Sequence, residues 1–156
     1  MTIYLPELSA NDVSFPALHR ALTEPDGLLA MGGDLSPERI WFAYQNGIFP
    51  WFNPGEEILW WCPDPRFVLF PDELKVSKSM RKILDKKVFT ITENQNFSEV
   101  IRNCREINRK GQEGTWLSDE LMETFNTLHR YGLARSVEVW QNNELVGGLY
   151  GIQIGK

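Results

Sequence analysis

The stretch SVEVWQNNELVGGLYGIQI, residues 136–154, decides the fold class of this chain of 156 residues. Apolar residues typical of strands lie on both sides of Asn142 and Asn143, and asparagine tolerates the positive φ of a tight turn. The pattern predicts a β-hairpin with strands at 136–141 and 144–154. Because helical patterns lie upstream of this hairpin, the sequence predicts an α+β protein.

The second strand of the hairpin stays apolar as far as Ile154, with Gly155 and Lys156 after it. An apolar hairpin without a neighbour leaves a strand edge and a sheet face uncovered. We therefore expect either further chain or a partner to cover them.

The region upstream of the hairpin is regularly periodic. Asn96 and Glu99 have the spacing of a capping box, and Ser118 and Gly132 are typical of the start and end of a helix. The expected elements are a helix at 77–84, a strand at 88–92, a helix at 96–107, a polar loop at 108–114 and a helix at 118–132.

The first third of the chain is rich in proline, glycine and tryptophan. It contains a predicted helix at 37–46 and two short predicted strands at 58–62 and 66–70. The composition shifts near the second strand, which predicts a small N-terminal domain at 1–65 and a second domain at 66–156.

The charge is distributed unevenly. The formal net charge is −5, yet residues 75–87 hold six basic side chains against one acidic side chain. Such a patch suits one localised contact with a polyanion, although a basic helix face in solvent would read the same way. The basic residues that share helical spacings are Lys78, Arg81, Lys82 and Lys86.

Cysteine and histidine usage argues against metal chemistry. Cys62, Cys104, His19 and His129 stand apart, without the paired spacing of a zinc site. No apolar run is long enough to span a bilayer, and the start of the chain does not read as a signal peptide. We expect no membrane contact and a cytoplasmic location.

Several stretches occur together in an unusual combination. They are GLLAMGGDLSP at 27–37, AYQNGIFPWF at 43–52, LWWCPDPR at 59–66, EGTW at 113–116, VEVW at 137–140 and VGGLYG at 146–151. In this order they resemble the leucyl/phenylalanyl-tRNA–protein transferases, and the resemblance covers essentially the whole chain.

This resemblance implies a small N-terminal domain followed by the first part of a GNAT-like acyltransferase domain. It also implies an aminoacyltransferase without a cofactor, which moves Leu or Phe, and Met less well, from aminoacyl-tRNA. The acceptors would be proteins with N-terminal Lys or Arg, which are thereby marked for degradation by the N-end rule. The residues of the chemical step are expected beyond Lys156, which leaves a non-catalytic tRNA-binding module as the alternative.

The resemblance also implies site residues. The positions that match an aminoacyl-adenosine site are Trp51, Trp116, Tyr44 and Phe125. Aromatic rings suit the stacking of a base, but a tryptophan beside apolar neighbours also reads as core. Phe125 lacks the hydroxyl of the tyrosine found in some members, so it offers no hydrogen bond. Trp60 and Trp61 must face opposite sides of a strand, so at most one can line a given pocket.

Three further expectations concern single features. Leu149, beside two glycines, is a candidate for lining the amino-acid pocket, although a glycine-weakened strand against a helix is equally compatible. The basic residues at 78–86 match a patch used against the tRNA acceptor stem. Glu138 alternates with apolar neighbours and is expected to face solvent.

Overall fold

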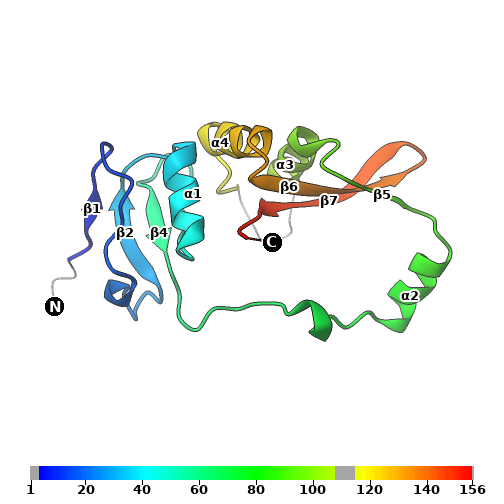
Figure 1. Ribbon diagram of the computed structural model, residues 1–156, viewed down its shortest axis with the longest axis horizontal. Helices are drawn as coiled ribbons and strands as arrows, with labels where there is room; N and C mark the ends of the chain where they lie inside the picture. Colours follow the sequence, from blue (N-terminus) through cyan, green and yellow to red (C-terminus); the bar gives the residue numbers. More distant parts are fainter. Residues whose placement is uncertain (1–3, 108–114, 156) are drawn as a thin grey trace.

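The computed structural model describes residues 4–107 and 115–155 and has the α+β architecture that the sequence predicts (Figure 1). The polar loop predicted at 108–114 lies outside the described residues. The N-terminal sheet has the order β1-β2-β4-β3, and the second sheet has the order β5-β6-β7.

The N-terminal sheet is built from short strands of the glycine- and tryptophan-rich third. They are β1 (Glu7–Leu8), β2 (Leu28–Gly32), β3 (Phe49–Pro50) and β4 (Leu59–Trp61). Strand β1 runs parallel to β2, whereas β4 runs antiparallel to both β2 and β3. The strand expected at 58–62 is therefore confirmed as β4, and β2 is a strand that the sequence reading missed.

Helix α1 (Pro37–Gln45) follows β2, which confirms the helix predicted at 37–46, and it contacts β3 of this sheet. The Ser36 side chain accepts a hydrogen bond from the Arg39 amide, and Pro37 occupies the first helical position. The fully buried Arg39 side chain pairs with Asp34 at 3.2 Å and donates to the Ser9 carbonyl at 2.7 Å. These interactions connect the start of α1 to Ser9, which follows β1.

The strand predicted at 66–70 is wrong. This part belongs to a largely exposed segment, residues 66–77, which includes the 3-10 turn Pro71–Glu73 and leads to α2 (Lys78–Asp85; Figure 1). The Phe67 side chain is 99% exposed, so no sheet or helix covers it among the described residues. The apolar run at 67–70 was present, but a strand also needs a neighbouring strand to pair with.

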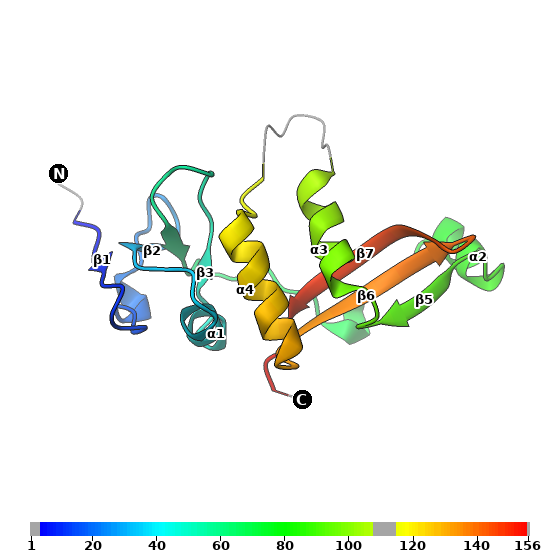
Figure 2. The same cartoon turned by 90° about the horizontal axis from the view of Figure 1, so that it is seen from above.

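The second sheet is an antiparallel meander with helices on one side (Figure 2). Its strands are β5 (Thr90–Glu93), β6 (Ala134–Gln141) and β7 (Glu144–Ile152), and its helices are α3 (Phe97–Glu106) and α4 (Asp119–Arg130). Asn142 and Asn143 have φ values of 52° and 64°, which confirms the predicted hairpin turn. In the described part of the chain, the outer edge of β7 pairs with no strand.

One hydrophobic core joins the two sheets. Helix α1 packs against α4, and the Thr124 hydroxyl donates to the Leu35 carbonyl at 2.5 Å across this junction. The cluster of buried side chains runs from Leu29 and Trp60 in the N-terminal sheet to Phe97 beside the second sheet. The interface between α1 and α4 is therefore part of the interior.

Replacing Gly27 tests how closely its turn packs against Pro63. Its φ is +84°, and an added Cβ would lie 2.5 Å from the backbone nitrogen of Pro63. Gly47 is a matched control, because its φ is +73° and a Cβ there would meet no atom within 4 Å. We expect Gly47→Ala to cost about 1–2 kcal/mol of unfolding free energy, which is the usual penalty for left-handed backbone.

Gly27→Ala is expected to cost at least about 1 kcal/mol more, because it adds overpacking against backbone to the same penalty. Urea unfolding of both variants measures the difference. Equal losses would show that the Pro63 contact relaxes without cost.

Candidate functional site

Four aromatic side chains meet where α1, α4 and β7 come together. Phe125 lies at the centre, with ring centroids at 6.3 Å from Tyr44, 6.4 Å from Trp116 and 5.5 Å from Tyr150. All three neighbours approach it edge-on, which is a favoured geometry for aromatic rings. We call Tyr44, Trp116, Phe125 and Tyr150 the Phe125 cluster. It contains three of the four aromatic residues predicted for the aminoacyl-adenosine site.

The members of the cluster differ in their access to solvent. Phe125 is only 1% exposed, so it supports its neighbours from behind, whereas Tyr44 and Trp116 are half-buried. Burial raises the pKa of Tyr44 to about 12, although the positive charge of Arg66 acts in the opposite direction. The Tyr44 hydroxyl therefore stays protonated at neutral pH and is able to donate a hydrogen bond.

Trp51, the fourth predicted residue, belongs to a second aromatic group. Its side chain is 59% exposed, and its ring centroid lies 5.9 Å from that of Trp61. The Trp61 indole also donates to the Trp51 carbonyl at 2.7 Å, which fixes the two residues together. No ring contact between Trp51 and the Phe125 cluster occurs among the described residues.

Trp60 and Trp61 are neighbours on β4, so their side chains lie on opposite faces of the strand. Trp60 is fully buried, stands edge-on to Phe15 at 4.9 Å and donates from its indole nitrogen to the Gly32 carbonyl at 2.9 Å. Of the two neighbours, Trp60 is thus a core residue, and Trp61 is the one beside a candidate ligand-binding side chain.

Arg66 contacts the segment between Tyr44 and Trp51 that connects these two aromatic groups, and sequence reasoning did not select it. Its guanidinium carbon lies 4.6 Å from the Phe49 ring centroid, and Nη1 donates to the Gly47 carbonyl at 3.1 Å. Its only sequence signal was its place at the end of LWWCPDPR. Tyr150 was likewise missed as a site residue, since its neighbour Leu149 was chosen instead.

Leu149 points to the face of the second sheet opposite the Phe125 cluster, because neighbouring residues of a strand alternate. Its side chain is 70% exposed, opposite Val137 of β6. The structure therefore does not bring Leu149 together with the predicted aromatic residues. Its role in an amino-acid pocket stays a prediction.

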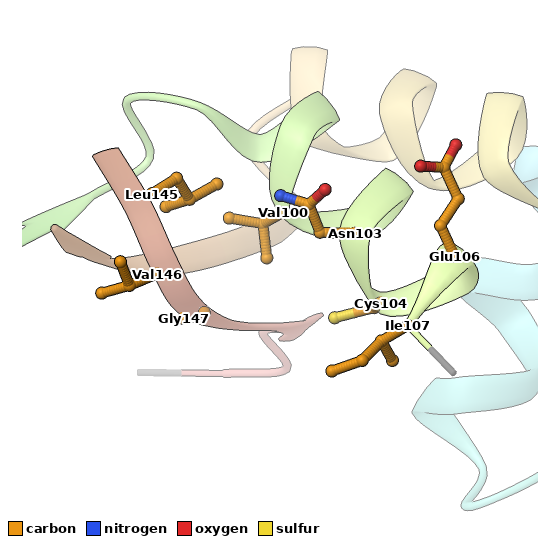
Figure 3. A pocket seen from close by; sticks show the side chains of 9 residues that line it. Val100, Asn103, Cys104, Glu106, Ile107, Leu145, Val146 and Gly147 are labelled. Carbon is orange, nitrogen blue, oxygen red and sulfur yellow. The ribbon is translucent and has the colours of Figure 1, made fainter. Parts of the chain in front are cut away.

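A separate groove of about 530 Å³ runs between α3 and β7 (Figure 3). Val100, Cys104 and Ile107 line one side, and Leu145 and Val146 line the other. None of the predicted site residues lines this groove, so the sequence-based site and this groove do not coincide.

Helix α2 has a basic face and an apolar face. The four predicted phosphate-binding residues lie on or directly after it and are exposed: Lys78, Arg81, Lys82 and Lys86. None of them takes part in an ion pair with a described carboxylate. At 100° per residue these four point to one side, while Met80, Ile83 and Leu84 point to the other. The basic face is therefore free to meet an anionic partner.

Glu138 corrects the expectation that it faces solvent, because its side chain is fully buried. It accepts hydrogen bonds from the hydroxyls of Thr92 and Ser136, both at 2.5 Å, and from the amides of Gln95 and Asn96. Glu138 thereby fixes the two residues that precede α3 from a neighbouring strand. Burial acts to raise its pKa, but the hydrogen bonds outweigh burial, and the pKa of Glu138 lies below its ordinary value. A base with its lone pairs so occupied is poorly suited to remove a proton from a substrate.

The helix expected after Asn96 forms, but the capping box expected there does not. The Asn96 side chain donates to Glu99 at 3.0 Å and does not cap the helix amides. By contrast, the Ser118 hydroxyl accepts from the Leu121 amide, as the sequence predicts for α4. The carboxylate of Glu138 accepts from the Asn96 amide, which is the bond that Glu99 would make in a capping box.

Residues 4–107 and 115–155 contain no group of histidine, cysteine or acidic side chains able to hold a metal ion. In the same part of the chain, no helix is long and apolar enough to cross a membrane.

Comparison with known proteins identifies two sequence profiles in this chain. The profile described as leucyl/phenylalanyl-tRNA protein transferase matches residues 68–156, and the profile of the N-terminal domain of the same transferase matches residues 33–64. Together they cover most of the described elements from α1 to β7.

Curated relatives match over nearly the whole chain. The leucyl/phenylalanyl-tRNA–protein transferase of Flavobacterium johnsoniae is 61% identical over 92% of this chain and 67% of its own length. The proteins of the same name from Hydrogenovibrio crunogenus and Syntrophus aciditrophicus are 54% and 55% identical, over 96% and 92% of this chain. The matched region is 58% and 59% of the length of these two relatives.

Proposed function

We propose that the protein transfers Leu or Phe from aminoacyl-tRNA to the N-terminus of another protein, because this chain belongs to the leucyl/phenylalanyl-tRNA–protein transferase family. The observation that carries the proposal is the 61% identity to a relative of that name over 92% of the chain. The aromatic groups and the basic helix support it, because they suit a nucleoside and a polyanion.

The proposed reaction requires little covalent chemistry from the protein. The nitrogen of the acceptor α-amine attacks the ester carbonyl carbon, the carbon–oxygen bond to the terminal ribose breaks, and the amine proton passes to the departing ribose oxygen. The ester is already activated, so the protein must mainly position the amine and stabilise the oxyanion.

The proposed aminoacyl-adenosine site uses both aromatic groups. Trp116 and Tyr44 offer half-buried rings that are held by Phe125, while Trp51 offers an exposed ring that is held by Trp61. Stacking on such rings is tolerant of the base and suits the invariant terminal adenosine of tRNA. Leu149 is retained in the proposal as a residue of the amino-acid pocket.

Several finer features complete the proposal. We propose acceptors with N-terminal Lys or Arg, Met as a poorer transferred residue, a role in N-end rule degradation and a location in the cytoplasm. We also propose a division into domains at residues 1–65 and 66–156, with a GNAT-like fold for the second. The profile matches to 33–64 and 68–156 support that division.

The basic face of α2 is proposed to bind the phosphate backbone of the tRNA acceptor stem. We expect the double variant Arg81→Glu with Lys82→Glu to weaken tRNA binding by about tenfold or more at low salt, because two phosphate contacts become repulsive. The slope of log affinity against log salt should fall in magnitude by about 2. Filter binding at several salt concentrations measures both quantities.

The matched control reverses two exposed arginines away from α2, Arg20→Glu with Arg102→Glu, and thus makes the same change in net charge. This control should bind tRNA with nearly the wild-type salt slope. If both double variants lost affinity equally, long-range charge and not the α2 face would account for the binding.

The function itself is tested by transfer of labelled Leu from tRNA to a peptide that begins with Lys. Label on the peptide is the expected result, with a peptide that begins with Asp as the control. Binding of tRNA without transfer would favour the non-catalytic alternative. The observation behind that alternative is that the α2 face is exposed and free of ion pairs with described residues.

A further inference from the structure

We propose that Arg66 forms a binding site for a phosphate group, namely the phosphodiester that precedes the terminal adenosine of the bound tRNA. This proposal rests on the proposed function, since it adds a contact to the aminoacyl-adenosine site. It assigns a role to a residue outside the basic face of α2.

The guanidinium of Arg66 is held in place but only partly used. Phe49 lies beneath it at 4.6 Å, and one nitrogen donates to the Gly47 carbonyl at 3.1 Å. A guanidinium has five N–H donors in a rigid fork, so most of them remain available. Among the described carboxylates none forms an ion pair with Arg66, and the side chain is exposed. An arginine fixed in this way is pre-organised to donate parallel hydrogen bonds to two oxygens of a carboxylate or a phosphate.

The position of Arg66 places this fork beside the proposed nucleoside site. Its two anchors, Gly47 and Phe49, lie on the short segment that leads from Tyr44 at the end of α1 to Trp51 after β3. The positive charge of Arg66 also acts on the pKa of Tyr44, which supports the closeness of the two groups. Arg66 is therefore anchored to the segment that joins the two aromatic groups proposed to hold the adenosine.

The chemistry of the substrates selects the ligand. The aminoacyl group carries a positively charged amine, the adenosine is neutral, and the proposed acceptor begins with a basic residue. The phosphodiester is the anionic group attached directly to the terminal nucleoside. The positively charged guanidinium of Arg66 would therefore attract the phosphate. It would not attract the amine, the adenosine or the basic acceptor residue.

Two small ligands separate a phosphate contact from a structural role. The probes are 3′-leucylamino-3′-deoxyadenosine, a stable amide in place of the ester, and the same compound with a 5′-phosphate. Wild-type protein should bind the phosphorylated probe about tenfold more tightly, the usual worth of a hydrogen bond to a charged group. In Arg66→Met this preference should disappear, while the unphosphorylated probe binds nearly as before.

Controls keep the outcome specific to this residue. Arg20→Met removes an exposed positive charge elsewhere and should keep the tenfold preference. Arg66→Lys should keep part of it, because lysine retains the charge but lacks the fork. Urea unfolding of Arg66→Met checks that loss of the Gly47 and Phe49 contacts leaves the protein folded.

Three results would overturn the proposal. Equal weakening of both probes by Arg66→Met would mean that Arg66 only anchors the end of α1. An absence of phosphate preference in wild-type protein that still binds the unphosphorylated probe would remove this contact and leave the proposed function standing. If wild-type protein bound neither probe, the aminoacyl-adenosine site would be refuted and the Arg66 contact with it.

Discussion

Replacing Glu138 with alanine is expected to lower the free energy of unfolding by about 3–6 kcal/mol. The two short hydrogen bonds from Thr92 and Ser136 contribute about 1.5–3 kcal/mol each, as is usual for bonds to a charged group. The variant also removes the acceptor from the amides of Gln95 and Asn96 at the start of α3. Thermal and urea unfolding give the change directly.

Glu138→Gln is the matched variant. It keeps the size and one acceptor oxygen, but it loses the charge and places an NH₂ group against neighbouring donors. Its loss should lie between zero and that of Glu138→Ala. Wild-type stability in the alanine variant would mean that the buried network contributes nothing net.

The same carboxylate makes stability depend on pH. Because the pKa of Glu138 is lowered in the folded state, the unfolded chain binds more protons as pH falls below the ordinary value of 4.5. The contribution of Glu138 is therefore fully present above 4.5 and is lost as the pH falls through the lower folded value. Glu138→Gln should show a shallower loss of stability in that acidic range, which urea unfolding at several pH values measures.

Removing the proposed stacking rings should have the largest effect on ligand binding. Trp51→Ala and Trp116→Ala are each expected to weaken binding of 3′-leucylamino-3′-deoxyadenosine by about 1–3 kcal/mol, or roughly 5- to 150-fold, which is the range for one stacked base. Trp51 is the cleaner test, because its ring is 59% exposed and its loss disturbs little packing. Isothermal titration gives both affinities.

Phenylalanine at either position keeps an aromatic plane and should recover most of the lost affinity. Tyr131→Ala is the control for a general loss of exposed aromatic surface, since Tyr131 is 69% exposed at the end of α4. It should bind like wild type. If Trp51→Ala and Trp116→Ala also bound normally, neither ring would stack on the adenosine.

Local signals were sufficient to predict most helices and the hairpin. Ser118 caps its helix as expected, and the paired asparagines form the predicted turn. The errors occur where a distant partner decides the structure. The segment at 66–70 has a strand pattern but no strand beside it, and Glu138 faces inward because α3 begins against it.

The candidate site could likewise be predicted from the sequence only in part. The resemblance selected Tyr44, Trp116 and Phe125, and the fold brings these three rings together from separate elements. It could not indicate that Phe125 is sealed behind the other two, because burial depends on the whole packing. Arg66 was missed because its partners are a backbone carbonyl and a ring, which carry no signature in the sequence.

The shared core beneath α1 and α4 has a consequence for how the molecule comes apart. A protease would find its natural cutting site in the exposed segment at 66–77, far from the interior. The two fragments would nevertheless stay together, held by the Thr124–Leu35 hydrogen bond and by the packing of Tyr44 on Phe125. A nicked molecule should therefore elute from a sizing column as one particle and separate into two pieces only in denaturant.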